Sequence, residues 1–181
     1  MPVLGLEEVI KNLNAKIQKI QERTASGLLR AAIQVRRAAQ IKTPVVTGNL
    51  RASAYVISAG GQVAVGQGTQ FPFDPQGKLK ERHREEIRTV QEVLRQRSKE
   101  TPIVAVGYSA VYALVVHENP NAGRAGYDPS KTTYKRGANM GKLKPAYRQH
   151  SRVGEWKFLQ SALSENENRI LAVIREEAGK K

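Results

Sequence analysis

The sequence predicts an α+β fold in which a long N-terminal helix and a C-terminal helix pack on a small, mainly antiparallel sheet. The helices are predicted by apolar residues at alternating three- and four-residue spacing over 7–41 and 155–181. Short extended runs bounded by glycine and proline predict three strands, at 50–58, 62–66 and 103–108.

Two segments extend from this predicted frame. An insert at 68–101 contains a charged helix over 78–100, and a flexible basic loop occupies 119–153. Because a chain of 181 residues has room for one hydrophobic core, we expect a single domain over 1–181.

The predicted N-terminal helix carries an apolar stripe along one side. Its members are Ile10, Leu13, Ile17, Ile20, Leu28, Ala31, Val35 and Ala38. Acidic residues at the start of the helix and basic residues near its end suit the helix dipole. Gly27 interrupts the stripe, which predicts either a kink or a close contact with another helix.

A tight corner joins this helix to the sheet. Pro44 moves Thr43 away from the helical conformation and so ends the helix. Gly48 can adopt a positive φ, which predicts a tight turn around it. After the turn, alternate side chains from Leu50 to Ser58 should point to opposite faces of the first strand.

A hairpin and a third strand complete the predicted sheet. Gly60 and Gly61 form the turn between the first two strands. The tetrapeptide Val-Ala-Val-Gly at 63–66 returns at 104–107, and we interpret the two copies as similar strands that are neighbours in one sheet.

The helix in the insert is strongly charged, and its apolar stripe is thin. The stripe consists of Leu79, Ile87, Val90 and Leu94. The other faces alternate basic and acidic residues, which is typical of a solvated helix with i, i+4 pairs. They also suit an arm that reaches DNA or a neighbouring subunit, and the thin stripe favours an arm completed by a partner. The residues assigned here to DNA or inter-subunit contact are Arg82, Arg84 and Arg88.

The segment after the third strand leads into the basic loop. The apolar run at 111–118 suits either a strand or a short helix, and we predict a helix. The loop at 119–153 carries eight basic side chains against one acidic side chain, Asp128, with tyrosines between them. This composition suits contact with a phosphate backbone and some stacking, or a loop that orders against neighbouring subunits. The loop residues assigned to such contacts are Lys135, Arg136, Lys142 and Lys144.

Charge is the strongest global indication of function. The net charge of +14 and the pI of about 10.2 favour a polyanionic partner, with nucleic acid first, over a basic surface that only aids solubility. The absence of cysteine excludes disulfides, thiolate metal sites and a cysteine nucleophile. The N-terminus does not resemble a signal peptide and no apolar run approaches a membrane span. We therefore expect a protein that is made in the cytoplasm and used either there or in a particle assembled there, without membrane contact.

No residue pattern predicts catalysis or a cofactor. His83, His117 and His150 are scattered, and no spacing of His, Asp and Glu imitates a metal site. His117 followed by Glu118 fits a helix-end pair better than a catalytic dyad. Nucleophile elbow, phosphate loop, helix-turn-helix and zinc-finger patterns are all missing from the sequence. We expect a protein that is not an enzyme.

Three motifs occur in an order that characterises a known family. Their residues are Pro44, Thr47, Gly48 and Leu50 in the corner, Tyr112 and Glu118 in the short helix, and Trp156, Phe158 and Leu159 at the start of the last helix. In this order the chain resembles the HK97 gp10-like family of tailed phages, variously called tail-completion, neck or head–tail connector proteins. The resemblance covers 1–65, 103–120 and 154–178, and the helix at 78–100 is an insertion relative to shorter members.

The resemblance implies a structural virion protein that forms a homo-oligomeric ring, a hexamer or dodecamer, at the head–tail junction. Head-closure or portal-side proteins and tail-tube proteins would be its neighbours, and genomic DNA would pass through the lumen without sequence-specific contact. The corner residues would define the fold, and those of the other two motifs would lie in the core or at an interface. Two other functions stay open: a tail terminator that caps the tail tube, and a basic nucleic-acid-binding protein that forms no ring.

Overall fold

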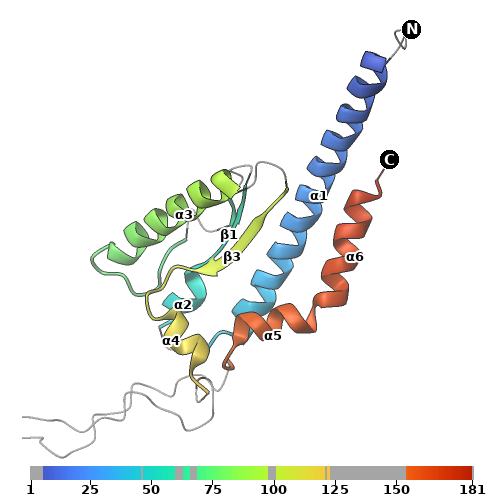
Figure 1. The fold of residues 1–181 in the computed structure, drawn as a ribbon. Coiled ribbons are helices and arrows are strands. Elements are labelled where there is room, and N and C mark those ends of the chain that lie inside the picture. Colours follow the sequence, from blue (N-terminus) through green and yellow to red (C-terminus); the bar gives the residue numbers. More distant parts are fainter. Residues whose placement is uncertain are drawn as a thin grey trace, which may run out of the picture.

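The computed structural model describes residues 6–45, 47–59, 63–65, 69–97, 101–120, 122 and 154–180. In chain order the elements are α1 (Leu6–Lys42), α2 (Asn49–Ala52), β1 (Ala54–Ser58), β2 (Val63–Val65), α3 (Lys78–Arg97), β3 (Val104–Tyr108), α4 (Ala113–Glu118), α5 (Phe158–Glu165) and α6 (Glu167–Ala178). The three strands form one antiparallel sheet against these helices, so the chain has the predicted α+β fold (Figure 1).

The sheet is centred on β1, and β2 and β3 pair with it on either side. Val56 of β1 lies opposite Val65 of β2 and Val106 of β3. The predicted hairpin of the first two strands is confirmed. The two Val-Ala-Val segments also share one sheet, but β1 separates them, so the prediction that they are neighbours is wrong.

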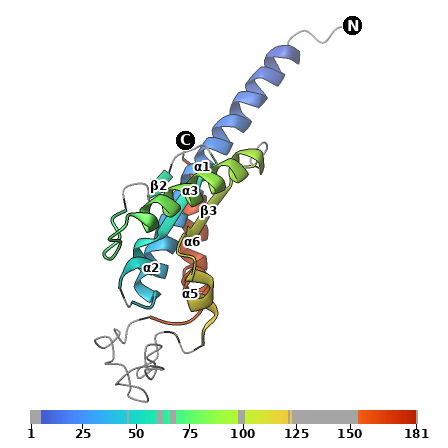
Figure 2. The same ribbon diagram turned by 90° about the vertical axis from the view of Figure 1, so that its left-hand side faces the viewer.

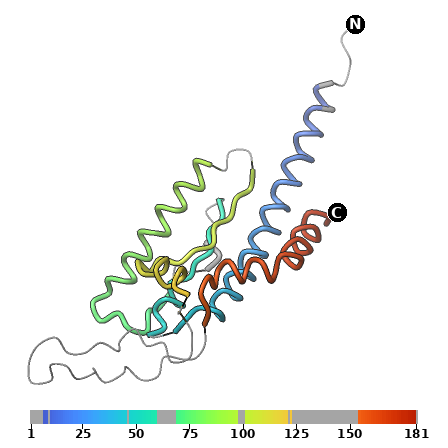
Figure 3. The backbone as a smooth tube through the Cα atoms, turned by 60° about the horizontal axis from the view of Figure 1, so that its bottom comes forward, coloured from blue at the N-terminus to red at the C-terminus, as the bar shows by residue number. Residues whose placement is uncertain are grey.

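Four layers follow one another across the domain: α3, the sheet, α1, and the pair α5 and α6 (Figures 1 and 3). Every side chain of β1 is buried, because helices cover both faces of the strand. On the face toward α3, Tyr55 and Ile57 form a hydrophobic cluster with Ile87 and Leu94. The alternation predicted along this strand is therefore present from Ala54 onward.

The helix α1 is continuous over 37 residues and contacts α6 at Gly27. A Cβ on Gly27 would lie 3.1 Å from the Cα of Ile174 and 3.2 Å from the Cβ of Glu177, so any larger residue here would push the two helices apart by a few tenths of an ångström. Glu177 forms ion pairs with Arg30 of α1 and with Lys180. Of the two alternatives predicted for Gly27, the structure has the close helix contact.

The N-terminal part of α1 projects beyond the rest of the domain (Figures 1 and 2). The last turn of α6 reaches Gly27, and the 21 residues of α1 from Leu6 to Ser26 precede that contact. At 1.5 Å per residue, this part of the helix is about 30 Å long. Its apolar stripe therefore has no covering layer from α6.

The first strand begins later than predicted. Gly48 has a φ of 85° and starts the short helix α2, in which the backbone N–H of Ser53 donates to the carbonyl oxygens of Asn49 and Leu50. The strand begins only at Ala54. The prediction of a strand from Leu50 is wrong, because the tight turn continues into one helical turn.

The C-terminal segment forms two helices rather than the single helix predicted. The break lies at Asn166, whose Nδ2 donates to the carbonyl oxygen of Ala162 over 2.8 Å. This bend turns the chain so that both α5 and α6 contact α1 (Figure 3).

The helix of the insert, α3, packs on its own sheet. His83 is 1% exposed, and its Nδ1 lies 2.6 Å from the Oγ of Ser109. The His83 ring also contacts the rings of Tyr55 and Phe71. The buried histidine widens the thin stripe seen in the sequence, so the expectation of an arm completed only by a partner is wrong for the described helix.

Candidate assembly interfaces

The three motifs that are far apart in the sequence meet in one hydrophobic cluster. The buried members of this cluster are Leu50 from the corner, Ala110 and Ala113 around the start of α4, and Phe158 from the start of α5. Tyr108, Val116 and Leu159 pack against them as partly buried neighbours. The corner, the short helix and the last helices therefore form a single unit, which we call the motif cluster.

Phe158 lies at the centre of the motif cluster. It is 1% exposed, and its ring meets those of Tyr108 and His117 edge-on at centroid distances of 5.1 and 4.9 Å. The backbone N–H of Lys157 donates to the carbonyl oxygen of His117 over 2.7 Å. These contacts join α5 to both β3 and α4. The prediction that Phe158 inserts into the core is confirmed, whereas Trp156 is 44% exposed and does not.

The corner is held by contacts that the sequence patterns did not indicate. Asn49 bonds the backbone of Phe73 twice: its Nδ2 donates to the carbonyl oxygen over 2.7 Å, and its Oδ1 accepts from the N–H over 3.0 Å. Gly154 has a φ of 122°, and a Cβ there would lie 2.4 Å from the Cα of Pro44. The corner thus binds both the insert loop and the segment that leads into α5.

A side-chain hydrogen bond links the corner to the start of α4. Burial raises the pKa of the Tyr112 hydroxyl, and its hydrogen bond with Thr47 acts in the opposite direction. Tyr112 itself is 41% exposed, and the side chain of Glu118 is 54% exposed and contacts His117 with its Oε1 2.8 Å from the Nδ1. Tyr112 and Glu118 therefore lie at the rim of the motif cluster, where His117 and Glu118 form the predicted helix-end pair.

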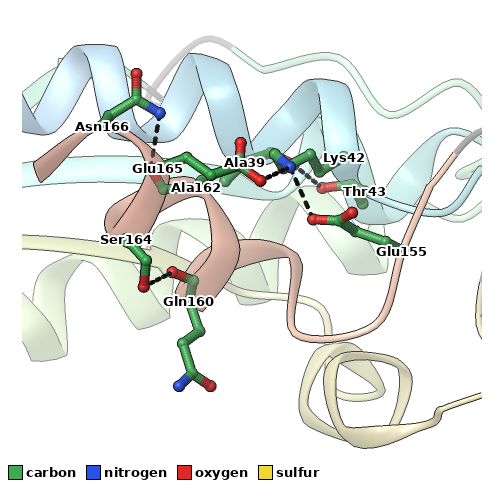
Figure 4. Close-up of polar contacts among 9 residues, drawn as sticks. All are labelled: Ala39, Lys42, Thr43, Glu155, Gln160, Ala162, Ser164, Glu165 and Asn166. Carbon is green, nitrogen blue, oxygen red and sulfur yellow. Dashed lines mark hydrogen bonds and ion pairs between the residues drawn. The ribbon is translucent and has the colours of Figure 1, made fainter.

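Lys42 joins the end of α1 to the segment that precedes α5 and to the last residue of α5. Its Nζ lies 2.9 Å from the Oε1 of Glu155 and 2.7 Å from the Oε1 of Glu165 (Figure 4). Hydrogen bonds to Glu165 and Glu155 raise the pKa of Lys42, and the bond from Lys42 lowers the pKa of Glu155. Next to it, the buried Thr43 places its Oγ1 2.7 Å from the carbonyl oxygen of Ala39. These polar contacts fix the corner relative to the last helices.

An apolar patch lies on the outer side of α4 and of the turn that precedes it. It consists of Val111, Leu114 and Val115, which are 65%, 71% and 70% exposed. Their spacing of three and four residues places them on one side of the helical turn. We call these three residues the α4 patch. The segment 109–120 that carries it contains Glu118 and neither lysine nor arginine, although the chain as a whole is strongly basic.

A second uncovered apolar surface lies on the projecting part of α1. Ile10, Leu13, Ile17 and Ile20 are each 45% to 55% exposed, and they repeat at the three- and four-residue spacing of a coiled-coil seam. We call these four residues the α1 stripe. Between Ile10 and Ile20 the sequence has three lysines and no acidic residue. The stripe is thus an apolar surface with basic flanks.

The basic residues assigned to DNA or subunit contact fall into two groups. Arg82, Arg84 and Arg88 are exposed on α3, on the side that the sheet does not cover. The other assigned residues, Lys135, Arg136, Lys142 and Lys144, lie outside the described residues. The structure therefore places the first group on the surface of α3, an element that contributes no residue to the motif cluster.

Neither a metal site nor a membrane-spanning helix is found in the described part of the chain. Within those residues, no cluster of three or more His, Asp or Glu side chains could hold a metal ion. None of the helices described has the length and apolar character needed to cross a membrane.

Comparisons of the chain with protein-family models, with curated proteins and with solved structures gave no match.

The sequence showed the residues of the α1 stripe as part of one apolar side of a helix, without separating a covered from an uncovered part, and it did not single out the α4 patch. For the α1 stripe, the indication available in the sequence was the length of the N-terminal helix. A helix of 37 residues exceeds the combined span of α5 and α6, so part of its apolar side had to remain uncovered within one chain. For the patch, the signal was an apolar run in a helix too short to bury all its faces.

Proposed function

We propose that this chain is a structural subunit of a tailed-phage virion that forms a ring at the head–tail junction. In this role it joins head to tail and surrounds the path of the DNA. The ring is a hexamer or dodecamer, with head-closure or portal-side proteins on one side and tail-tube proteins on the other. The proposal includes no catalytic step and no cofactor.

The observation that carries the proposal is the motif cluster. The three motifs of the resemblance occupy separate parts of the sequence, yet Leu50 of the corner, Ala113 directly after Tyr112, and Phe158 of the last motif pack together in one buried group. Chance matches to three short motifs would not need to meet in space. Their packing supports the interpretation that they belong to one structural unit of the resembling family.

The surface of the chain supports an assembling role. The α1 stripe and the α4 patch leave apolar side chains exposed on two separate elements, and exposed apolar patches mark interaction surfaces. The net charge of +14 suits a lumen through which DNA passes, because a basic or neutral wall does not repel phosphates. Arg82, Arg84 and Arg88 on α3 are surface residues that suit this role.

Light scattering of the purified chain tests the proposal, at low and high salt, with and without a short DNA duplex. The ring predicts a discrete multiple of 20.0 kDa that persists without DNA and at high salt. A chain that stays monomeric at all concentrations would count against the ring.

A basic nucleic-acid-binding protein without a ring is the second candidate, and the high net charge is the observation that favours it. It predicts a monomer that binds duplex DNA at low salt and releases it steeply as salt rises, because bound phosphates are exchanged for counterions. The ring predicts weak DNA affinity in the isolated subunit. A tail terminator would share the ring and differ in its position, which images of whole particles would reveal.

A further inference from the structure

The α1 stripe and the α4 patch lie toward opposite ends of the described part of the molecule (Figures 1 and 2). The stripe is on the projecting half of α1, and the patch is on α4 beside the motif cluster. Within one chain, the two surfaces therefore cannot cover each other.

We propose that the α1 stripe of one copy docks on the α4 patch of the next copy. This inference rests on the proposed ring, and it names the surfaces that would close it. A ring needs a heterologous contact, in which each subunit uses two different surfaces, whereas a self-complementary contact through one surface stops at a dimer. The chain offers two such surfaces on separate elements.

The charges around the two surfaces are complementary. Lys11, Lys16 and Lys19 lie between Ile10 and Ile20 and are all exposed, and this stretch has no acidic residue. Glu7, Glu8 and Glu22 lie beyond its two ends. The patch has the exposed carboxylate of Glu118 beside it and no basic residue in its own segment. Lys157 is a basic residue close to the end of α4, and its ammonium lies 5.1 Å from the centre of the Trp156 ring. A second copy thus brings lysines toward a surface that carries a carboxylate.

The same charges disfavour pairing of the stripe with itself. Two copies of α1 laid seam to seam would bring six lysines to a short contact that has no carboxylate between Ile10 and Ile20. Like charges at such an interface oppose association and direct the partner choice. The patch is therefore the better partner for the stripe.

The absence of cysteine allows a direct test in the full-length chain, because each engineered variant carries a single thiol. Ile17→Cys places a thiol on the stripe and Leu114→Cys places one on the patch; both positions are exposed, so the fold should be preserved. The two variants, one of them with a cleavable tag that makes the products distinguishable, are mixed at high concentration and mildly oxidised. Glu85→Cys, exposed on α3 and given no role in assembly, replaces either partner as the matched control.

The proposal predicts that the mixed disulfide of Ile17→Cys with Leu114→Cys exceeds either homodimer and either control product by roughly tenfold, because docking raises the effective concentration of the two thiols. A dominant homodimer of Ile17→Cys would overturn the proposal in favour of stripe-to-stripe pairing. Mixed product at the control level would also overturn it.

The result also separates this inference from the proposed function. If light scattering gives a discrete oligomer while the mixed disulfide stays at the control level, the ring stands and the assigned surfaces are wrong. If the chain is monomeric and the mixed disulfide is absent, both the ring and the docking fail.

Discussion

Replacing Phe158 by alanine tests whether the motif cluster holds the domain together. The side chain is 1% exposed and its ring meets two other rings edge-on, so the change removes both packing volume and aromatic contacts. Truncation of a buried phenylalanine costs about 3–5 kcal/mol, and the two ring pairs place the expected loss toward the upper end. A typical domain has only about 5–15 kcal/mol of stability, so the variant should lose a large part of it.

Urea unfolding followed by circular dichroism measures this loss. Trp156→Ala is the matched control two residues away, because Trp156 is 44% exposed and its removal should cost less than about 1 kcal/mol. Phe158→Leu keeps most of the volume and provides a folded variant if alanine prevents folding. Equal losses for Phe158→Ala and Trp156→Ala would refute the central position of Phe158.

Three further predictions follow from single sites. Gly154→Ala should destabilise the chain more than Gly77→Ala. Both glycines have a positive φ, which costs about 1–3 kcal/mol for other residues, but only at Gly154 would a Cβ also collide with Pro44. Equal urea midpoints for the two variants would contradict this. Hydrogen bonds from Lys180 and Arg30 hold the pKa of Glu177 below its usual 4.5. The stability that the Glu177 carboxylate contributes is therefore present above pH 4.5 and is lost as the pH falls through the lower pKa of the folded state. Glu177→Gln should flatten this acid dependence of the urea midpoint. Burial raises the pKa of Tyr108 from 10.0 to about 12. The stability that the neutral hydroxyl contributes is therefore complete below pH 10 and is lost as the pH rises toward 12. In an ultraviolet titration, Tyr108→Phe should show one late-titrating tyrosine fewer than the parent chain.

Periodicity alone predicted the elements that have long, regular patterns. The stripe of α1 and the extended runs of β1 and β3 gave the fold class, since helix and strand periods differ clearly over such lengths. The corner was also predictable, because Pro44 and Gly48 restrict the backbone locally. Phe158 was expected to lie in the core or at an interface, and it is buried in the core.

The errors share a physical cause, which is that tertiary contacts override weak local signals. The helix α2 has only four residues, too few for a period to be visible. The break at Asn166 follows from the need to wrap α5 and α6 around α1, with Gly27 allowing the close approach. His83 was counted as polar, yet its contacts with Ser109 and aromatic rings allow it to be buried under α3.

The exposed surfaces were the hardest part to predict. Whether an apolar residue is covered depends on which element packs over it, and the apolar spacing along α1 continues on both sides of Gly27 in the sequence. Only the structure separates the buried half, with Ala31 and Val35, from the exposed half, with Ile10 and Ile17. The basic residues of the loop at 119–153, assigned to DNA or subunits, stay a prediction.

Electron microscopy of the purified chain at high protein concentration tests the central claim most directly. A subunit of a neck ring predicts closed rings with rotational symmetry and an open lumen, formed without DNA. Particles no larger than the 20.0 kDa chain at every concentration, together with salt-sensitive binding of duplex DNA, would contradict the ring and favour the nucleic-acid-binding alternative.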